Sequence, residues 1–270
     1  MKSLYIFVSS ERPDPYLNSL THCVLGRDVR NVVFIHIKGL EVSRRNTTMI
    51  GALSGRIMGA VQTQLEGLAE RGEYLLNGEH ILLREKYTDS RANEIQVYYK
   101  RCRDLPVLFS NEELDYKDLR QRIRAIAAHE HETYVDVTAI KKRYLGDIVA
   151  AAVVEGLGGL HVFDIVGPQP DYDEPWKLLI HELEKSAAHS FEYINIVDTE
   201  VYRSCARSIF LRTPSLLSSV VVTVILVAAF VSCYWFLGAQ SKITQTMLVI
   251  SSAASILSPV LGFIVPRGAK

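Results

Sequence analysis

A cluster of positive residues follows a short apolar segment near the middle of the chain. Residues 133–138 read TYVDVT, which is typical of a buried strand, and Lys141, Lys142 and Arg143 precede a helical pattern, YLGDIVAAAVVEG. The first N–H groups of a helix carry partial positive charge, so cations there are unfavourable by roughly a few tenths of a kcal/mol unless an anion lies nearby. With the Thr138 hydroxyl beside them, these cations predict a site for a phosphate-bearing ligand.

An acidic side chain of the protein itself is the alternative partner for these cations. Asp136 is close to them in the sequence and could pair with them directly. It could also point across the sheet face and accept hydrogen bonds from backbone N–H groups of the loop. The sequence leaves these explanations open.

Polar residues also follow the first apolar segment, SLYIFV. The next residues, SSERPDP, place the hydroxyl and N–H groups of Ser9 and Ser10 where a polar ligand could meet them, with Arg12 beside them. An ordinary strand-to-helix loop, in which Ser, Asp and Pro act as turn and capping residues, explains the same pattern. Both explanations stay open.

These loops belong to an alternation of strand-like and helix-like segments. Strands are expected at 3–8, 31–37, 133–138, 160–165 and 191–197, and helices at 15–25, 47–71, 116–129, 144–156 and 175–188. Such an alternation predicts an α/β fold with a mostly parallel sheet and helices on both faces. Proteins with such a sheet bind their ligands beyond the carboxyl ends of the strands. The region 75–110 is ambiguous between additional strands and a short helix.

The last part of the chain has a different composition. No charged residue occurs in 213–241 or in 243–266, and each stretch is long enough for the roughly 20 apolar residues that cross a bilayer as a helix. We therefore expect a cytosolic domain at 1–212 and two membrane helices, at about 215–237 and about 244–265. A buried helical hairpin inside a larger soluble core is the alternative.

Cations beside the two expected membrane helices predict their orientation. The flanking cations are Arg203, Arg207, Arg212, Arg267 and Lys270, whereas the connecting loop carries only Lys242. Because cations stay on the cytoplasmic side, both termini should face the cytoplasm. The expected location is a plasma membrane.

Charge balance and cysteine usage argue against several classes of protein. Lys plus Arg and Asp plus Glu number 30 each, so the composition gives no reason to expect polymeric nucleic acid as a partner. The four cysteines, Cys23, Cys102, Cys205 and Cys233, form no CxxC pair, which argues against a zinc module and a disulfide framework. No nucleophile or metal motif is recognisable, so we predict no catalytic residue, no metal and no cofactor.

Two segments resemble a known family. VDVTAIKKRYLGDIVAAA is similar to the signature D-[VI]-T-G-G-T-K, followed by a helix, of CARF-type Rossmann-like sensor domains. YIFVSSERP is similar to the first strand and serine-containing loop of that family. The resemblance implies a homodimer or higher homo-oligomer that binds a cyclic oligonucleotide messenger. The ligand contacts that it implies are Ser9, Ser10, Thr138 and Lys141 or Lys142.

The sequence departs from this family at the paired glycines, which are Ala139 and Ile140 here. Side chains at these positions would obstruct the close backbone approach that glycines allow. The ligand would then differ from the usual cyclic oligoadenylates, or the chain would belong to a neighbouring branch of Rossmann-like sensors.

The first function that we consider is a membrane-bound effector of bacterial antiviral defence. The resemblance implies that it senses a nucleotide messenger and then disrupts or permeabilises the inner membrane. Two helices alone form no pore, so this activity requires oligomers. Ala254, Ser258 and Gly262 form a stripe of small residues that permits close helix contact, although packing within one chain explains the stripe equally well.

Two other functions remain as alternatives. One is a membrane-anchored enzyme that processes a nucleotide, for which Glu11 and His36 are weak candidates as general acid or base. The other is an anchor that recruits a protein partner, with arginines before the first membrane helix touching anionic lipid.

Overall fold

The computed structural model describes residues 1–38, 52–128, 133–167, 172–186 and 189–204, with isolated positions from Val221 to Thr246. The chain divides into two units, Met1–Tyr202 and Arg203–Lys270. Among the described residues, no helix is both long and apolar enough to cross a bilayer.

Several predictions for the C-terminal region fall outside the described residues. These are the boundary between residues 212 and 213, the flanking cations beyond Arg203, the small-residue stripe (Ala254, Ser258 and Gly262) and all but isolated positions of both membrane helices. Cys205 and Cys233 also lie outside the described residues, whereas Cys23 and Cys102 are buried free thiols. The membrane helices therefore stay a prediction.

The first unit is built on a six-stranded sheet with the order β5-β2-β1-β6-β7-β8. Neighbouring strands are parallel except for β7 and β8. The strands are β1 (Lys2–Val8), β2 (Val29–Lys38), β5 (Leu108–Asp115), β6 (Thr133–Asp136), β7 (Leu160–Val166) and β8 (Ser190–Asn195). Counted along the chain, they lie third, second, first, fourth, fifth and sixth, which is the order of doubly wound Rossmann-like folds. The predicted α/β fold with a mostly parallel sheet is confirmed.

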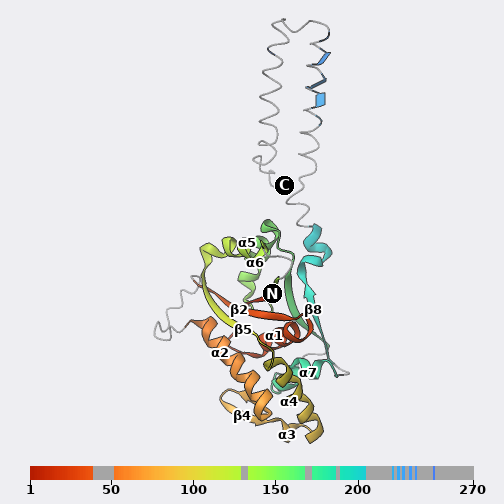
Figure 1. The fold of residues 1–270 in the computed structure, drawn as a ribbon. Helices are drawn as coiled ribbons and strands as arrows, with labels where there is room; N and C mark the ends of the chain where they lie inside the picture. The colour runs from red at the N-terminus through yellow and green to blue at the C-terminus, as the bar shows by residue number, and fades with distance from the viewer. Residues whose placement is uncertain are drawn as a thin grey trace. The chain divides into compact units, whose positions relative to one another are not determined.

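Helices cover both faces of this sheet (Figure 1). On one face lie α1 (Asp14–Gly26), α2 (Leu53–Glu66) and α4 (Asp89–Arg103), and on the other lie α5 (Leu119–Ala127) and α6 (Lys142–Glu155). The sequence of β1 explains the two layers, since Leu4, Ile6 and Val8 join the first core and Phe7 joins the second. Successive side chains of a strand point to opposite faces.

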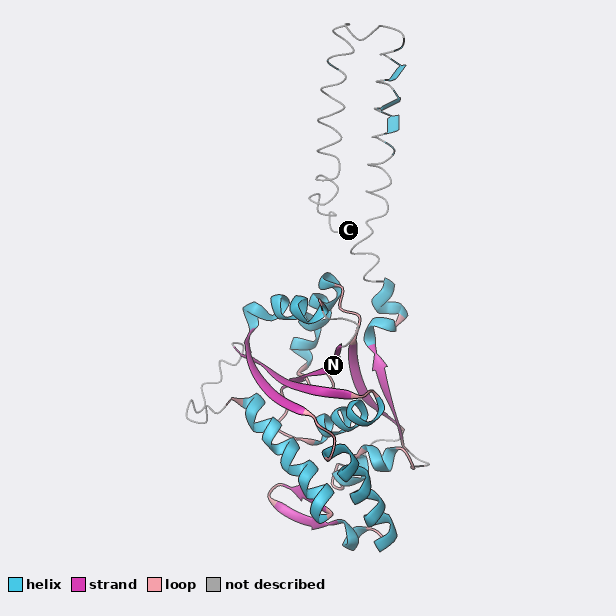
Figure 2. Cartoon of the chain, in the orientation of Figure 1, coloured by secondary structure: helices cyan, strands magenta, loops and turns pink. Residues whose placement is uncertain are grey.

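The region that the sequence leaves ambiguous forms an additional layer beyond α2. A π-helical turn (Gly67–Arg71) continues α2, the hairpin of β3 (Glu73–Leu76) and β4 (Glu79–Leu82) follows, and α3 (Leu83–Lys86) leads into α4. Asn77 and Gly78 turn the hairpin with φ angles of 52° and 90°, a left-handed conformation that Asn-Gly turns favour. Figure 2 shows the hairpin apart from the main sheet.

The predicted helix at 175–188 is wrong. The structure has a 3-10 turn (Pro175–Leu178) and a short helix, α7 (Ile180–Leu183), with Leu179 extended between them. The buried amide of Asn18 holds both neighbours of Leu179, because it donates to the preceding carbonyl oxygen (2.9 Å) and accepts from the following N–H (2.9 Å). A tertiary contact from α1 thus overrides the local helical pattern.

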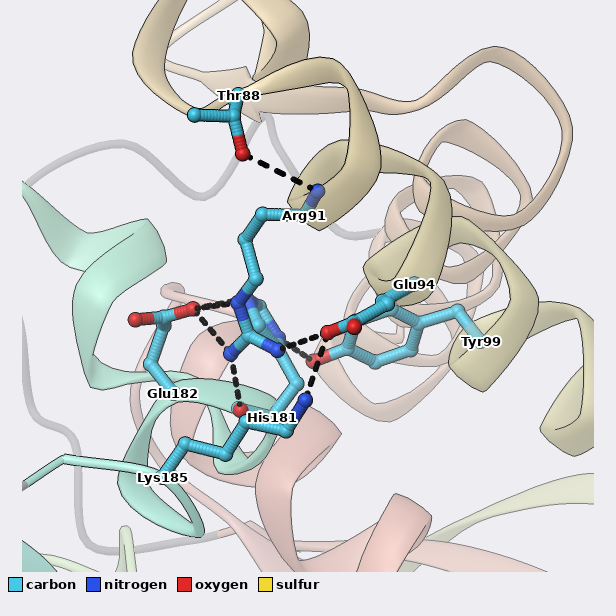
Figure 3. Close-up of polar contacts among 7 residues, drawn as sticks. All are labelled: Thr88, Arg91, Glu94, Tyr99, His181, Glu182 and Lys185. Atoms are coloured by element: carbon cyan, nitrogen blue, oxygen red, sulfur yellow. Dashed lines mark hydrogen bonds and ion pairs between the residues drawn. The ribbon is translucent and has the colours of Figure 1, made fainter.

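An ion-pair network ties the α7 segment to α4 (Figure 3). The guanidinium of Arg91 donates to the Glu182 carboxylate at 2.6 and 3.1 Å and to Glu94 at 2.9 Å. Lys185 donates to the same Glu94 carboxylate at 2.6 Å. The two cations and two carboxylates balance one another, so the cluster holds the segments together and offers no excess charge to a ligand.

A buried histidine joins the same two segments. The Tyr99 hydroxyl and Nδ1 of His181 are 2.8 Å apart, and both side chains are buried. Burial lowers the pKa of His181 to about 3, so the ring is neutral at physiological pH. This hydrogen bond therefore forms without a buried charge, whose desolvation would be costly.

Gly159→Ala should destabilise the first unit. A Cβ at this position would lie 2.8 Å from the backbone carbonyl oxygen of Thr133, so the turn before β7 would have to move away from β6. Overpacking of this kind lowers the free energy of unfolding by about 1–3 kcal/mol. Thermal unfolding of the purified full chain measures the effect.

Gly146→Ala is the matched control, because a Cβ there meets nothing within 4 Å. Since Gly146 lies inside α6, alanine should stabilise the protein by up to about 1 kcal/mol through helix propensity. Equal melting temperatures for both variants would contradict the close approach at Gly159.

Candidate ligand-binding site

The two polar loops predicted from the sequence meet at one place in the sheet. β1 and β6 are adjacent parallel strands, and the strand order reverses between them. Rossmann-like folds form a ligand crevice beyond the carboxyl ends of the strands at such a switch point. The hydroxyl of Ser9, just after β1, donates to the backbone carbonyl oxygen of Ala139, in the loop after β6, at 2.7 Å. The structure therefore joins the two loops.

The backbone of the first loop is already hydrogen-bonded within the protein. The Tyr16 hydroxyl accepts from the N–H groups of Ser9 (3.1 Å) and Ser10 (2.8 Å) and donates to the Ser10 carbonyl oxygen (3.0 Å). The Ser10 hydroxyl accepts from the N–H of Arg12 at 3.2 Å. These contacts are those expected of an ordinary strand-to-helix loop, in which the serines act as turn and capping residues. The exposed Arg12 side chain is the cation of this loop, beside the exposed carboxylate of Glu11.

The second loop is held by a buried carboxylate. Asp136 is 0% exposed and accepts from the N–H (3.1 Å) and the hydroxyl (3.0 Å) of Thr138. The Thr138 hydroxyl also accepts from the N–H of Phe163 in β7 at 2.8 Å. Asp136 thus caps the loop by accepting hydrogen bonds, which is one of the two alternatives that the sequence leaves open. Thr138 connects β6 to β7 and has little capacity left for a ligand.

The surroundings of Asp136 contain few formal charges. Burial raises the pKa of Asp136 to about 6, although hydrogen bonds from Ser19 and Thr138 act in the opposite direction. Burial also raises the pKa of the nearby Cys23 thiol to about 12. Burial therefore disfavours charge in the layer beneath the loop, and the pKa of about 6 leaves Asp136 ionised at neutral pH.

The three predicted cations stand together at the start of α6. Lys141 is its N-cap residue, Lys142 and Arg143 begin the helix, and all three are exposed. Arg143 donates to the Tyr144 hydroxyl at 2.8 Å, and its guanidinium lies 4.6 Å from the centre of that ring. The buried Asp136 accepts hydrogen bonds from Thr138, and the three exposed cations lie beside the switch point.

The three other helices that follow β1, β2 and β5 each have a carboxylate at their start, which for α2 comes from the neighbouring strand β5. Asp14 is in the first turn of α1, and Asp118 is the N-cap residue of α5. Glu113 accepts from the N–H and hydroxyl of Ser54, in the first turn of α2, at 3.1 and 2.6 Å. The first turn of α6 contains no acidic residue. Since a helix N-terminus favours negative charge, the start of α6 differs from the other three in having no acidic residue in its own first turn.

Sequence reasoning missed the cluster around Glu113, which comes from the unassigned strand β5. His36, a weak candidate for acid–base chemistry, places Nδ1 2.9 Å from Glu113. Burial opposes ionisation of Glu113, but hydrogen bonds from Ser54 and His36 outweigh it and lower the pKa of this carboxylate. The other candidate, Glu11, forms an ion pair with Arg56 at 3.5 Å. In the described ranges, no group of His, Cys, Asp or Glu is arranged to hold a metal ion.

The two residues at the positions of the paired glycines pack inward. Ala139 packs against the core shared with α1 and α2, and Ile140 packs against the core shared with α5 and α6. Each side chain therefore contributes to one of the cores on either side of the sheet.

Comparisons with known proteins give no family for the chain. No protein-family model matches the sequence, and no curated protein matches it either. The resemblance to CARF-type sensor domains stays a prediction from two short motifs.

Asp136→Asn should change how stability depends on pH. The folded pKa of about 6 exceeds the ordinary value of 3.8, so Asp136 favours folding at low pH, and this contribution is lost as the pH rises through about 4 to about 6. Asparagine does not ionise. The free energy of unfolding of the variant, relative to the wild type, should therefore increase over this interval by up to about 3 kcal/mol. Denaturant unfolding of the full chain at several pH values measures it.

The difference between variant and wild type is the useful quantity because two histidines act in the opposite direction. Burial lowers the pKa of His161 to about 4 and that of His181 to about 3, so both destabilise the fold as the pH falls below about 6.5. Asp164→Asn, at an exposed position of β7, is the control. A difference for Asp136→Asn that stays constant with pH would contradict the buried carboxylate.

Proposed function

We propose that the chain is a membrane-bound sensor. Its first unit binds a cyclic oligonucleotide or a related phosphorylated messenger, and its C-terminal region then disrupts or permeabilises the membrane. The observation that carries this proposal is the start of α6, where three exposed cations meet a helix N-terminus whose first turn has no acidic residue.

Electrostatics supports a ligand with more than one phosphate. Lys141, Lys142 and Arg143 repel one another and the partial positive charge of the helix end. Phosphate oxygens accept charge-assisted hydrogen bonds from all three side-chain types and from backbone N–H groups. Because a single phosphate group carries at most about two negative charges, a di- or oligonucleotide matches this cluster better.

The position of the cluster supports a nucleotide over a free phosphate ion. It lies beside the switch point, where doubly wound sheets accommodate nucleotides in the crevice beyond the strands. Arg12, from the loop after β1, adds an exposed cation that comes from the other half of the sheet. A homodimer, as the resemblance implies, would bring two such clusters to one cyclic ligand.

The second unit supports the membrane part of the proposal through its composition and exposure. The segments 213–241 and 243–266 contain no charged residue. Among the described positions of this unit, Val224 and Ile225 are each 60% exposed and Trp235 is 83% exposed. Exposed apolar side chains on helical positions suit contact with lipid rather than water. The role in bacterial antiviral defence follows from the family resemblance alone.

Lys142→Gln should weaken ligand binding without changing the fold. We would melt the full chain, purified in detergent, with a panel of cyclic di-, tri- and tetranucleotides. A compound at 100 times its dissociation constant stabilises the folded state by about 2.7 kcal/mol. Loss of one charge-assisted contact, about 1.4 kcal/mol, should raise that constant about tenfold.

Lys100→Gln is the matched control, because Lys100 is an exposed cation in the last turn of α4, which leads toward the start of β5 at the opposite edge of the sheet. It should leave the ligand-induced shift unchanged. Absence of any shift across the panel would contradict the sensor and favour a protein-recruiting anchor. Conversion of a labelled panel compound into product would favour the nucleotide-processing enzyme.

A further inference from the structure

A cavity opens at the amino edge of the sheet, on the side opposite the loops of the candidate ligand site. Its volume is about 500 Å³. It is formed where β6 and β7 begin and the antiparallel β8 ends. The residues that line it are Arg27, Thr133, Tyr134, Gly158, Gly159, His161, Tyr193, Asn195 and Asp198. None of them belongs to the loops at the carboxyl edge, so this cavity is separate from the sensor site.

Flat rings form one wall of this cavity. His161 and Tyr193 are stacked, with ring centres 4.9 Å apart and planes at 13°. Tyr134 packs against the other part of His161, with ring centres 5.4 Å apart. Burial lowers the pKa of His161 to about 4, so this wall is uncharged at neutral pH. Stacked aromatic side chains of this kind are suited to a flat heterocycle.

A single exposed cation stands at the rim. The Arg27 guanidinium lies 5.9 Å from the centre of the Tyr134 ring, and it forms no ion pair within the part of the chain that the structure describes. An arginine in this position can donate two hydrogen bonds to the oxygens of one phosphate group in a bidentate contact. The guanidinium thus lies beside the aromatic rings, where it can bind the phosphate of a small nucleotide whose base contacts these rings.

Asn195, which also lines the cavity, is hydrogen-bonded within the protein. The side-chain oxygen of Asn195 accepts from the N–H groups of Leu160 (3.1 Å) and Val197 (3.2 Å). Its amide nitrogen donates to the carbonyl oxygen of Gly158 (3.0 Å) and to Asp198 (2.9 Å). This one side chain therefore links the turn before β7 to the residues that follow β8. The buried Nδ1 of His161 has no hydrogen-bond partner among the described residues.

We propose that this cavity binds a flat heterocycle that carries one phosphate, of the size of a nucleoside monophosphate. Its volume falls within the range of about 300–1,000 Å³ that small-molecule sites occupy. The ring of Tyr134, which packs on the buried His161, contacts the base, and Arg27 binds the phosphate. This inference goes beyond the proposed sensor function, because it uses a different edge of the sheet and none of the same residues.

Isothermal titration calorimetry of the full chain with the four common nucleoside monophosphates, and with the matching nucleosides, tests the proposal. Arg27→Gln should weaken binding of the monophosphate about tenfold and leave the nucleoside unchanged. Tyr134→Leu should weaken both ligands, because the ring that contacts the base is lost. Arg27 is exposed, so its substitution should not affect folding even where the Tyr134 variant does.

Lys142→Gln separates this site from the sensor site. Under the proposal, it leaves monophosphate binding unchanged, whatever it does to cyclic oligonucleotides. The proposal is overturned if none of the four monophosphates gives heat at millimolar concentration, or if Arg27→Gln binds them as tightly as the wild type. It is also overturned if Lys142→Gln, and not Arg27→Gln, abolishes binding, since the ligand would then occupy the carboxyl edge.

Discussion

The arrangement of the carboxyl edge depends on one buried carboxylate. Asp136 is fully buried at the end of a four-residue strand, where an unsatisfied charge would be strongly destabilising. Its oxygens are satisfied by Thr138, whose hydroxyl in turn receives an N–H of β7. This requirement fixes the loop after β6 and places the first residues of α6 beside the loop after β1. A short central strand thereby sets the geometry of the whole switch point.

Four helices begin at the carboxyl edge of the sheet, and the charges at their N-termini differ. Asp14, Asp118 and Glu113 supply negative charge at the starts of α1, α5 and α2, whereas α6 begins with cations. The first three helix starts thus have a carboxylate of the protein beside them, whereas the first turn of α6 contains none. This asymmetry is the physical basis of the proposed ligand site.

Most of the sheet could be predicted from the sequence because its central strands are apolar and short. β1, β2 and β6 each alternate between the two main cores, and β7 alternates between the second core and a smaller cluster that contains Phe163 and Ile165. β5 was harder to assign, because LFSNEELD is an edge strand with only Leu114 buried. The break at Leu179 could not be predicted, since it depends on the amide of Asn18, more than 150 residues away in the sequence.

The candidate sites, like the fold, could be predicted only in part from the sequence. The strand-order rule located the loops of Ser9 and Thr138, but not the Tyr16 hydroxyl that holds the Ser9 and Ser10 backbone. The amino-edge cavity has no sequence signal, because its residues come from four separate segments that only the sheet brings together. Register nevertheless connects the two edges, since Asp136 pairs with His161 across β6 and β7. One residue of that pair anchors the loop at the carboxyl edge, and its neighbour lines the cavity at the other, so both sites depend on the same two short strands.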